Sequence, residues 1–188
     1  MADHDNDHNH KAFLDMCKNG ETEKVRMALV TGVDGNAADY DGWTALILAA
    51  HGGHLAAVEL LLQQQNVEVN AADIDGRTAL HFAAVNGNND VLNSLHNHPG
   101  IDLGAVTEEG ETALHALVQN HWYPVDPDIL RNILNNPAVD PNARDLQGWT
   151  PITILLDDVD VDGTEMLQML VDNDRVDIEH ESLEDLAR

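Results

Sequence analysis

Aspartates alternate in the segment DDVDVDG, where Asp158, Asp160 and Asp162 precede a glycine. Oxygen ligands on alternate positions before a turn-forming glycine are typical of the first half of a helix–loop–helix calcium site. Such a loop also needs a bidentate glutamate at its twelfth position, and counting from Asp158 that position holds Met169. We therefore expect a solvated acidic loop, with a weak calcium site at the three aspartates as the alternative.

A second set of potential metal ligands lies in residues 1–10, where histidines stand among aspartates. Removal of Met1 would leave His4 third from a free amine, an arrangement that chelates Cu(II) or Ni(II) through amine, amide and imidazole nitrogens. The alternative is an acidic tail with no metal role. We expect residues 1–10 to form a flexible, acidic, His-rich tail, and we assign no metal or cofactor to the chain.

Residues that could act as nucleophiles are few. The chain has two serines, Ser94 and Ser182, and neither lies in a nucleophile elbow. Cys17 aligns with an alanine on an apolar helix face, so a buried thiol is expected there. There is no phosphate-binding loop, dinucleotide fingerprint or His-Glu-x-x-His motif. We therefore expect no enzymatic activity.

Four segments repeat one pattern: DGWTALILAA, DGRTALHFAA, EGETALHALV and QGWTPITILL. Their shared glycines are Gly42, Gly76, Gly110 and Gly148, with spacings of 34, 34 and 38 residues. A repeat of this length that opens with Thr-Ala-Leu-His resembles the ankyrin repeat. The second and third segments match that signature closely, and the first and fourth match it in part. The resemblance covers residues 11–184.

This resemblance implies an all-α solenoid of paired antiparallel helices joined by β-hairpin or turn connections. The expected repeats are residues 11–40, 41–74, 75–108, 109–146 and 147–184, and residues 185–188 form a C-terminal end or cap. The signature threonines stand where helix N-caps belong, and Pro151 takes a first helical position. The family also implies that His81 and His115 bond neighbouring backbone groups. The extra residues of the last two repeats are expected to enlarge the loop between their two helices.

Charge limits the partners that the chain can bind. It has 34 acidic residues against 9 Lys and Arg, a formal net charge of −25. Nucleic acids are poor partners for such a surface because like charges repel, whereas a Lys/Arg-rich polypeptide is its natural complement. No apolar run approaches the length that spans a bilayer, and no signal peptide or nuclear-import cluster is present. We expect an intracellular protein of the cytoplasm or nucleus that binds neither nucleic acid nor membrane.

Ankyrin-like arrays bind proteins on their concave side, through turn tips and the exposed side of the first helix of each pair. The candidate residues here are Tyr40, Asp41, Trp43, Asp75, Arg77, Glu108, Glu109, Glu111 and Trp149, with Trp122 in the enlarged fourth loop as a second patch. Carboxylates beside indoles suit a basic peptide, because carboxylates attract Lys or Arg and indole faces accept them by cation–π contact. The alternative is that the indoles only cover neighbouring hairpins.

Three classes of function stay open at this point. The first is a non-enzymatic adaptor or inhibitor that captures a basic segment of another protein. The second is a metal-responsive protein that uses the acidic loop or binds Cu, Ni or Zn at the His tail. The third is a structural fragment of a longer repeat scaffold. Separately, Leu62 and Asn70 resemble the ankyrin context that asparaginyl hydroxylases recognise, which makes Asn70 a possible modification site.

Overall fold

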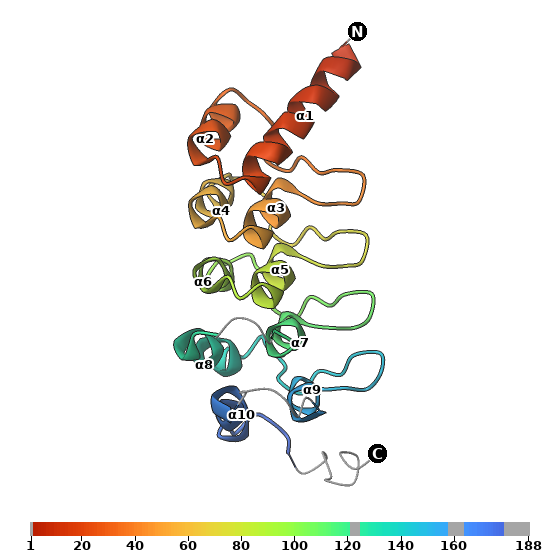
Figure 1. Ribbon diagram of the computed structural model, residues 1–188, viewed down its shortest axis with the longest axis vertical. Coiled ribbons are helices and arrows are strands. Elements are labelled where there is room, and N and C mark those ends of the chain that lie inside the picture. Colours follow the sequence, from red (N-terminus) through yellow and green to blue (C-terminus); the bar gives the residue numbers. More distant parts are fainter. Residues whose placement is uncertain (1, 121–124, 158–163, 179–188) are drawn as a thin grey trace.

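The chain folds as a stack of antiparallel helix pairs (Figure 1). The computed structural model describes residues 2–120, 125–157 and 164–178, and only the backbone of residues 2–8 and 164. The helices of these ranges are α1 (Ala2–Lys18), α2 (Thr22–Val30), α3 (Ala45–His51), α4 (Leu55–Leu62), α5 (Ala79–Val85), α6 (Asn89–His96), α7 (Ala113–Val118), α8 (Pro127–Asn135), α9 (Pro151–Asp157) and α10 (Thr164–Val171). The predicted all-α solenoid of about five repeats is thereby confirmed.

The signature threonines begin the first helix of each pair, as predicted. Thr44 Oγ1 accepts a hydrogen bond from the Ile47 N–H at 3.1 Å, and Thr112 caps α7 in the same way. Pro151 is the first residue of α9, where its missing N–H leaves no helical bond unmade. The sequence thus determines where these short helices start, because a capped first turn offsets part of the cost of nucleating them.

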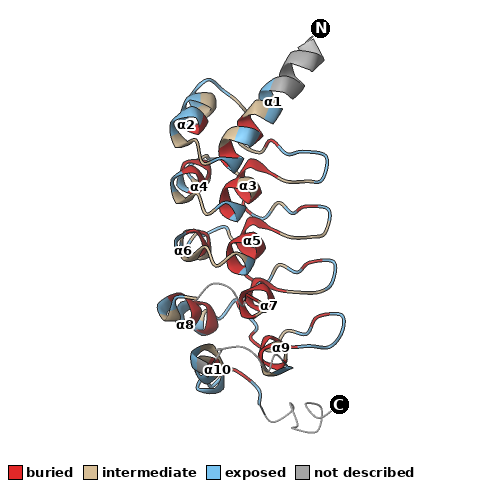
Figure 2. Cartoon of the chain, in the orientation of Figure 1, coloured by how far each residue is buried: buried red, intermediate tan, exposed pale blue. Residues whose placement is uncertain are grey.

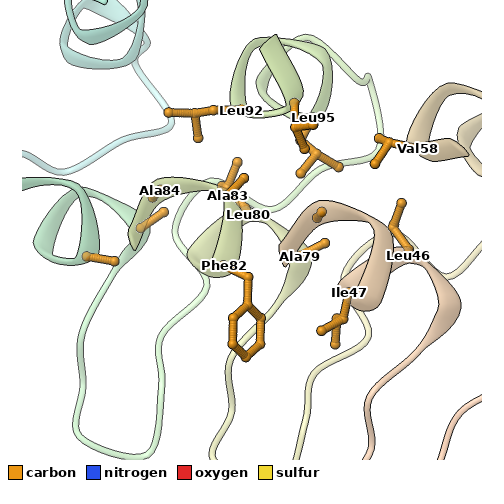
Figure 3. Packing of buried hydrophobic residues seen from close by; sticks show 14 of the residues in the cluster. Leu46, Ile47, Val58, Ala79, Leu80, Phe82, Ala83, Ala84, Leu92 and Leu95 are labelled. Carbon is orange, nitrogen blue, oxygen red and sulfur yellow. The ribbon is translucent and has the colours of Figure 1, made fainter. Parts of the chain in front are cut away.

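Buried residues gather where the helices of the stack face one another (Figure 2). Small and branched apolar side chains fill the space between the pairs (Figure 3). Ala79 and Ala83 of α5 let neighbouring helices approach closely. Leu92 and Leu95 of α6 cover them from the second helix of the pair. We call the first helix of each pair the inner helix and the second the outer helix. Cys17 is fully buried, and burial raises the pKa of its thiol to about 12. The prediction of a buried thiol is confirmed, and a group so protonated is no nucleophile at neutral pH.

The hairpins before α3, α5, α7 and α9 project in a row on one side of the stack (Figure 1). Antiparallel bridges close three of them, at Ala38–Thr44, Ala72–Thr78 and Val106–Thr112. One backbone hydrogen bond then joins each tip to the next: Ile74 N–H to Asp41 O at 3.0 Å, Glu108 N–H to Asp75 O at 2.9 Å, and Leu146 N–H to Glu109 O at 2.8 Å. We call this series the hairpin ladder.

The ladder requires glycine at the tips. Gly42 has a φ of +80°, which side chains with a Cβ adopt at a cost. A Cβ on Gly42 would also lie 2.9 Å from the Asp73 Cα of the next hairpin. Gly148 has a similar φ of +88°, but no heavy atom would lie within 4 Å of its Cβ. The two positions therefore separate the conformational role of a tip glycine from its role in stacking.

The start of the array differs from expectation. Helix α1 begins at Ala2, so residues 2–10 continue the first helix of the array, where we expected a flexible tail. Phe13 and Cys17 anchor this helix in the core, and a helix once nucleated extends at little cost. The limits given for the repeats, and for residues 185–188, stay predictions.

The extra residues of the last two repeats lie between their helices, as predicted. Residues 119–126 separate α7 from α8, whereas residues 86–88 separate α5 from α6. Residues 158–163 separate α9 from α10. Met169 is half-buried and packs on the core. None of the helices in the described ranges combines the length and the apolar character that crossing a bilayer requires.

We predict that Gly42→Ala lowers the free energy of unfolding by about 2–3 kcal/mol and that Gly148→Ala lowers it by about 1 kcal/mol. Both changes strain a positive φ, but only the first pushes a methyl group into the neighbouring backbone and disturbs the ladder hydrogen bond. Urea unfolding followed by circular dichroism measures both. Equal losses would show that the close approach at Gly42 contributes nothing.

Candidate functional site

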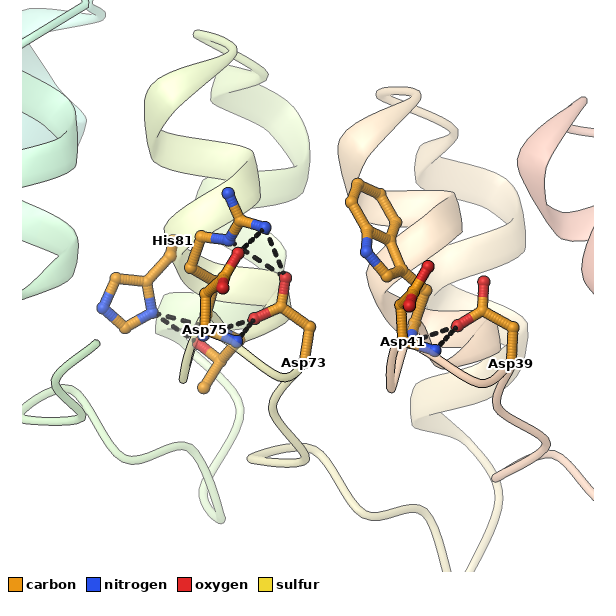
Figure 4. A network of polar contacts seen from close by, with 8 residues as sticks. Asp39, Asp41, Asp73, Asp75 and His81 are labelled. Carbon is orange, nitrogen blue, oxygen red and sulfur yellow. Dashed lines mark hydrogen bonds and ion pairs between the residues drawn. The ribbon is translucent and has the colours of Figure 1, made fainter. Parts of the chain in front are cut away.

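Three aspartates of the hairpins bind their own backbone, and Figure 4 shows two of them, Asp39 and Asp73. Asp39, Asp73 and Asp145 each accept two N–H groups at one carboxylate oxygen, from residues two and four positions further on, at 2.8–3.0 Å. Asp73 and Asp145 are also buried. These carboxylates fix the hairpin conformation, so they are structural groups and add little to the surface that a partner would meet.

The acidic residues that point outward are those of the tips. They are Asp41, Asp75, Glu108, Glu109 and Glu111, all among the predicted binding residues, and we call them the acidic strip. The hairpin ladder brings them together, because its hydrogen bonds join the backbones of successive tips and four of the five acidic residues take part in them. Glu108 and Glu109 are exposed, and neither forms an ion pair within the described residues.

Arg77 interrupts the acidic strip at the third repeat. Its guanidinium pairs with Asp73 at 2.8 Å and with Asp75, and it lies 5.0 Å from the centroid of the Phe82 ring. The hydrogen bond to Asp73 is the main cause that raises the pKa of Arg77. Arg77 thus offsets one of the two negative charges of Asp73 and Asp75, and the Asp75 carboxylate is ion-paired. The free negative charge of the strip is concentrated at Glu108, Glu109 and Glu111 in the fourth repeat.

The two tryptophans of the hairpin column are not equivalent. The Trp43 ring lies 4.5 Å from the ring of Phe82 and 5.3 Å from that of His51, measured between centroids, and is half-buried. Trp149 occupies the same position two hairpins after Arg77 and is 38% exposed. Trp43 therefore packs on the next repeat, whereas Trp149 leaves part of its indole exposed in the hairpin that follows Glu108, Glu109 and Glu111. The sequence pattern alone did not separate these two roles.

The remaining predicted binding residues are Tyr40, Glu111 and Trp122. Tyr40 is fully exposed at the first tip. Glu111 accepts a hydrogen bond from the Gln119 side chain at 2.7 Å, which holds its carboxylate near the end of α7. Trp122, with the enlarged loop around it, lies outside the described residues, and its role stays a prediction.

His81 and His115 join successive repeats, as the family resemblance implied. His81 Nδ1 accepts the Thr78 N–H at 3.2 Å, and its Nε2 donates to the Glu111 carbonyl at 3.1 Å. His115 repeats this arrangement with the Trp149 carbonyl as acceptor, at 3.2 Å. An imidazole that accepts at one nitrogen and donates at the other is neutral. Accordingly, burial lowers the pKa of His81.

Asparagines form a second link between repeats. Asn70 donates to the Gly100 carbonyl at 2.9 Å and accepts the Asp102 N–H at 2.8 Å, and Asn36 and Asn142 make the corresponding bonds in their repeats. This role was not identified from the sequence, although the recurrence of asparagine at one repeat position was the signal for it. Hydroxylation of the exposed Asn70 stays a prediction.

Metal ligands do not gather in the part of the chain that the structure describes. Within those ranges no three His, Cys, Asp or Glu side chains are close enough to hold an ion. The predicted calcium ligands Asp158, Asp160 and Asp162 lie outside the described residues, and so does the side chain of His4. Both metal hypotheses therefore stay untested predictions.

Comparison with known families gives two matches. The family described as ankyrin repeats in three copies matches residues 13–107, about half of the chain. The family described as a single ankyrin repeat matches residues 109–146. Comparison with curated proteins gives no match.

We predict that Trp43→Ala lowers the free energy of unfolding by about 2 kcal/mol, because it removes the indole that packs on Phe82. Trp149→Ala should change it by less than about 1 kcal/mol, since this side chain is more exposed. Urea unfolding of the two variants tests this difference. Losses of the same size would mean that Trp149 is as firmly packed as Trp43.

We also predict that the stability contributed by His81 is lost as the pH falls below its usual pKa of 6.5. Below that pH the unfolded chain takes up a proton on His81 that the folded state disfavours, so the free energy of unfolding falls. Carboxylates titrate as well, so the quantity to compare is the wild type minus His81→Ile, the residue found at the matching Ile47. This difference should shrink between pH 7.5 and 5.5.

The matched control for this measurement is Thr153→Ile, which changes the corresponding position of the fifth repeat. Thr153 bonds Thr150 in place of a histidine and does not titrate. The difference between the wild type and this control should therefore be the same at both pH values. A His81 difference that is constant with pH would contradict the prediction.

Proposed function

The chain belongs to the ankyrin repeat family, and from this premise we propose that it is a non-enzymatic binding module that captures a Lys/Arg-rich segment of a partner protein. Ankyrin repeats generally mediate interactions between proteins and are typically not enzymes. The observation that carries the proposal is the group of carboxylates at Glu108, Glu109 and Glu111, together with the partly exposed indole of Trp149 in the adjoining hairpin.

The geometry of the hairpins in the fourth and fifth repeats supports this site. Leu146 N–H binds the Glu109 carbonyl at 2.8 Å, so the two tips are held side by side. His115 fixes the backbone of Trp149 through its carbonyl, and Gln119 holds the Glu111 carboxylate. The site is therefore preorganised, which lowers the cost of ordering side chains when a partner binds.

Electrostatics decides what such a site selects. An exposed ion pair contributes about 0–1 kcal/mol, and a cation–π contact at an exposed indole contributes about 0.5–1 kcal/mol. A few such contacts give weak to moderate affinity that depends on salt. The net charge of −25 adds a long-range field that speeds the approach of a basic segment and repels nucleic acid. The chain would then act as an adaptor or an inhibitor of the protein that carries the segment.

We expect a fluorescent 12-residue peptide rich in Lys and Arg to bind, and its affinity to fall about 10-fold in the variant E108Q/E109Q/E111Q. Trp149→Ala should weaken it about 5-fold, because the cation–π partner is lost. Fluorescence anisotropy at 50 and 150 mM salt gives both affinities. Glutamine keeps the hydrogen-bonding oxygen that Gln119 uses, so the triple variant should remain folded.

The control variant is E59Q/D90N/E165Q, which removes the same number of charges from the exposed positions of the outer helices α4, α6 and α10. It should weaken binding less than 3-fold. Equal weakening by both triple variants would show that only net charge matters, and the proposed site would be wrong. Pull-down from cell extract with the wild type and the E108Q/E109Q/E111Q variant would then identify partners that depend on the site.

A further inference from the structure

A groove of about 530 Å³ lies between α1 and the hairpin of the second repeat. Helix α1 overhangs that hairpin at the start of the array (Figure 1). The residues of the groove that matter here are Lys11, Leu14 and Lys18 of α1, Tyr40 of the hairpin and Leu48 of α3. This volume is in the range of pockets that hold a small ligand or a few side chains.

Comparison of successive repeats shows which element fills the corresponding space elsewhere in the array. Tyr40 and Leu48 precede Ile74 and Phe82 by 34 residues, so they hold the same positions in successive repeats. At Ile74 and Phe82 the corresponding space is filled by the preceding hairpin. Its Asp41 carbonyl accepts the Ile74 N–H, and its Trp43 packs on the Phe82 ring. The first repeat has no such hairpin, because α1 occupies residues 2–18.

The groove also differs from the acidic strip in charge. Within the described residues, the ammonium groups of Lys11 and Lys18 form no ion pair or hydrogen bond, and the N–H of Tyr40 forms no hydrogen bond. Two carboxylates, Asp15 and Asp39, balance the lysines, but Asp39 already accepts the N–H groups of its own hairpin. In a chain of net charge −25, the groove offers hydrogen-bond donors and cations to a ligand.

We propose that this groove binds a turn of a partner protein that replaces the missing hairpin, with an acidic residue followed two positions later by an aromatic residue. The template is the chain's own Asp41-Gly42-Trp43. The backbone carbonyl of the acidic residue accepts the Tyr40 N–H, its carboxylate is attracted to Lys11, and the aromatic ring packs between Leu48 and Lys18. Lys18 takes the position that His51 has beside Trp43.

This inference rests on the proposed function only for the nature of the partner, a protein. The turn would be a second contact, at the opposite end of the array from Trp149. A partner that carries a basic segment and such an acidic-aromatic turn would be held in one orientation, because each element fits only one end. Requiring both elements would also exclude proteins that are merely basic.

The test uses the full chain labelled with ¹⁵N and a cyclic peptide that carries residues 38–44, ADYDGWT. Cyclisation keeps the turn formed, because an isolated hairpin is marginal in water. Amide shifts are expected at Tyr40, Leu48 and Lys18, with the Tyr40 amide proton moving downfield as it gains a hydrogen bond. Peptides in which Trp43 is replaced by Ala, or Asp41 by Lys, should bind about 10-fold more weakly.

On the protein side, the variant K11E/K18E should weaken the cyclic peptide about 10-fold, whereas Lys24→Glu, a lysine already paired with Glu21 on α2, should leave it unchanged. Absence of shifts at the groove at millimolar peptide, or equal binding of a scrambled cyclic peptide, would overturn the proposal. So would slow exchange of the Tyr40 amide in the free protein, since the groove would then be filled by the chain's own residues.

The basic peptide is titrated into the same labelled sample, so the two proposals are tested separately. Its shifts are expected in the fourth and fifth repeats. If it fails to bind while the cyclic peptide occupies the groove, the proposed function is wrong in its basic segment and the groove assignment stands. If only the basic peptide binds, the groove assignment is wrong and the proposed function stands.

Discussion

The hydrogen bond that joins each hairpin tip to the next sets the geometry on which the rest of the molecule depends. A single helix pair buries too little apolar surface to be stable, so each pair must stack on a neighbour at a fixed distance. The ladder bonds of 2.8–3.0 Å fix that distance at the tips, and the bonds of His81 and His115 fix it at the helix starts. Alanines in the inner helices allow the same close approach inside the core.

Because the stacking distance is fixed, residues at the same position of successive repeats lie next to one another on the surface. Residues at one repeat position form a row, so a single substitution in one repeat changes the chemistry at one point of that row. Arg77 is such a change, because it places a cation, paired with Asp73 and Asp75, in an otherwise acidic row. Phe82 is another, because Trp43 packs on its ring and is half-buried there, whereas Trp149 is 38% exposed. The site therefore results from local departures within a regular scaffold.

The regular part of the structure was predictable, and the departures were not. Threonine caps, Pro151, the buried Cys17 and the inter-repeat histidines follow from local sequence and from the family pattern, and the structure confirms them. The role of Trp43 depends on which residue stands 39 positions later, at Phe82, which no local rule shows. The extension of α1 through residues 2–10 was missed because the packed half of the helix overrides the weak propensity of the acidic half.

Because Cys17 is buried, its reactivity can report local opening of the first repeat. The thiol has no exposed surface, and burial raises its pKa to about 12, so it stays protonated while the array is closed. An alkylating reagent can therefore react only when the first helix pair separates from the stack. Since end repeats of a solenoid have one neighbour instead of two, the reaction rate of this single cysteine reports how often the array opens at its start.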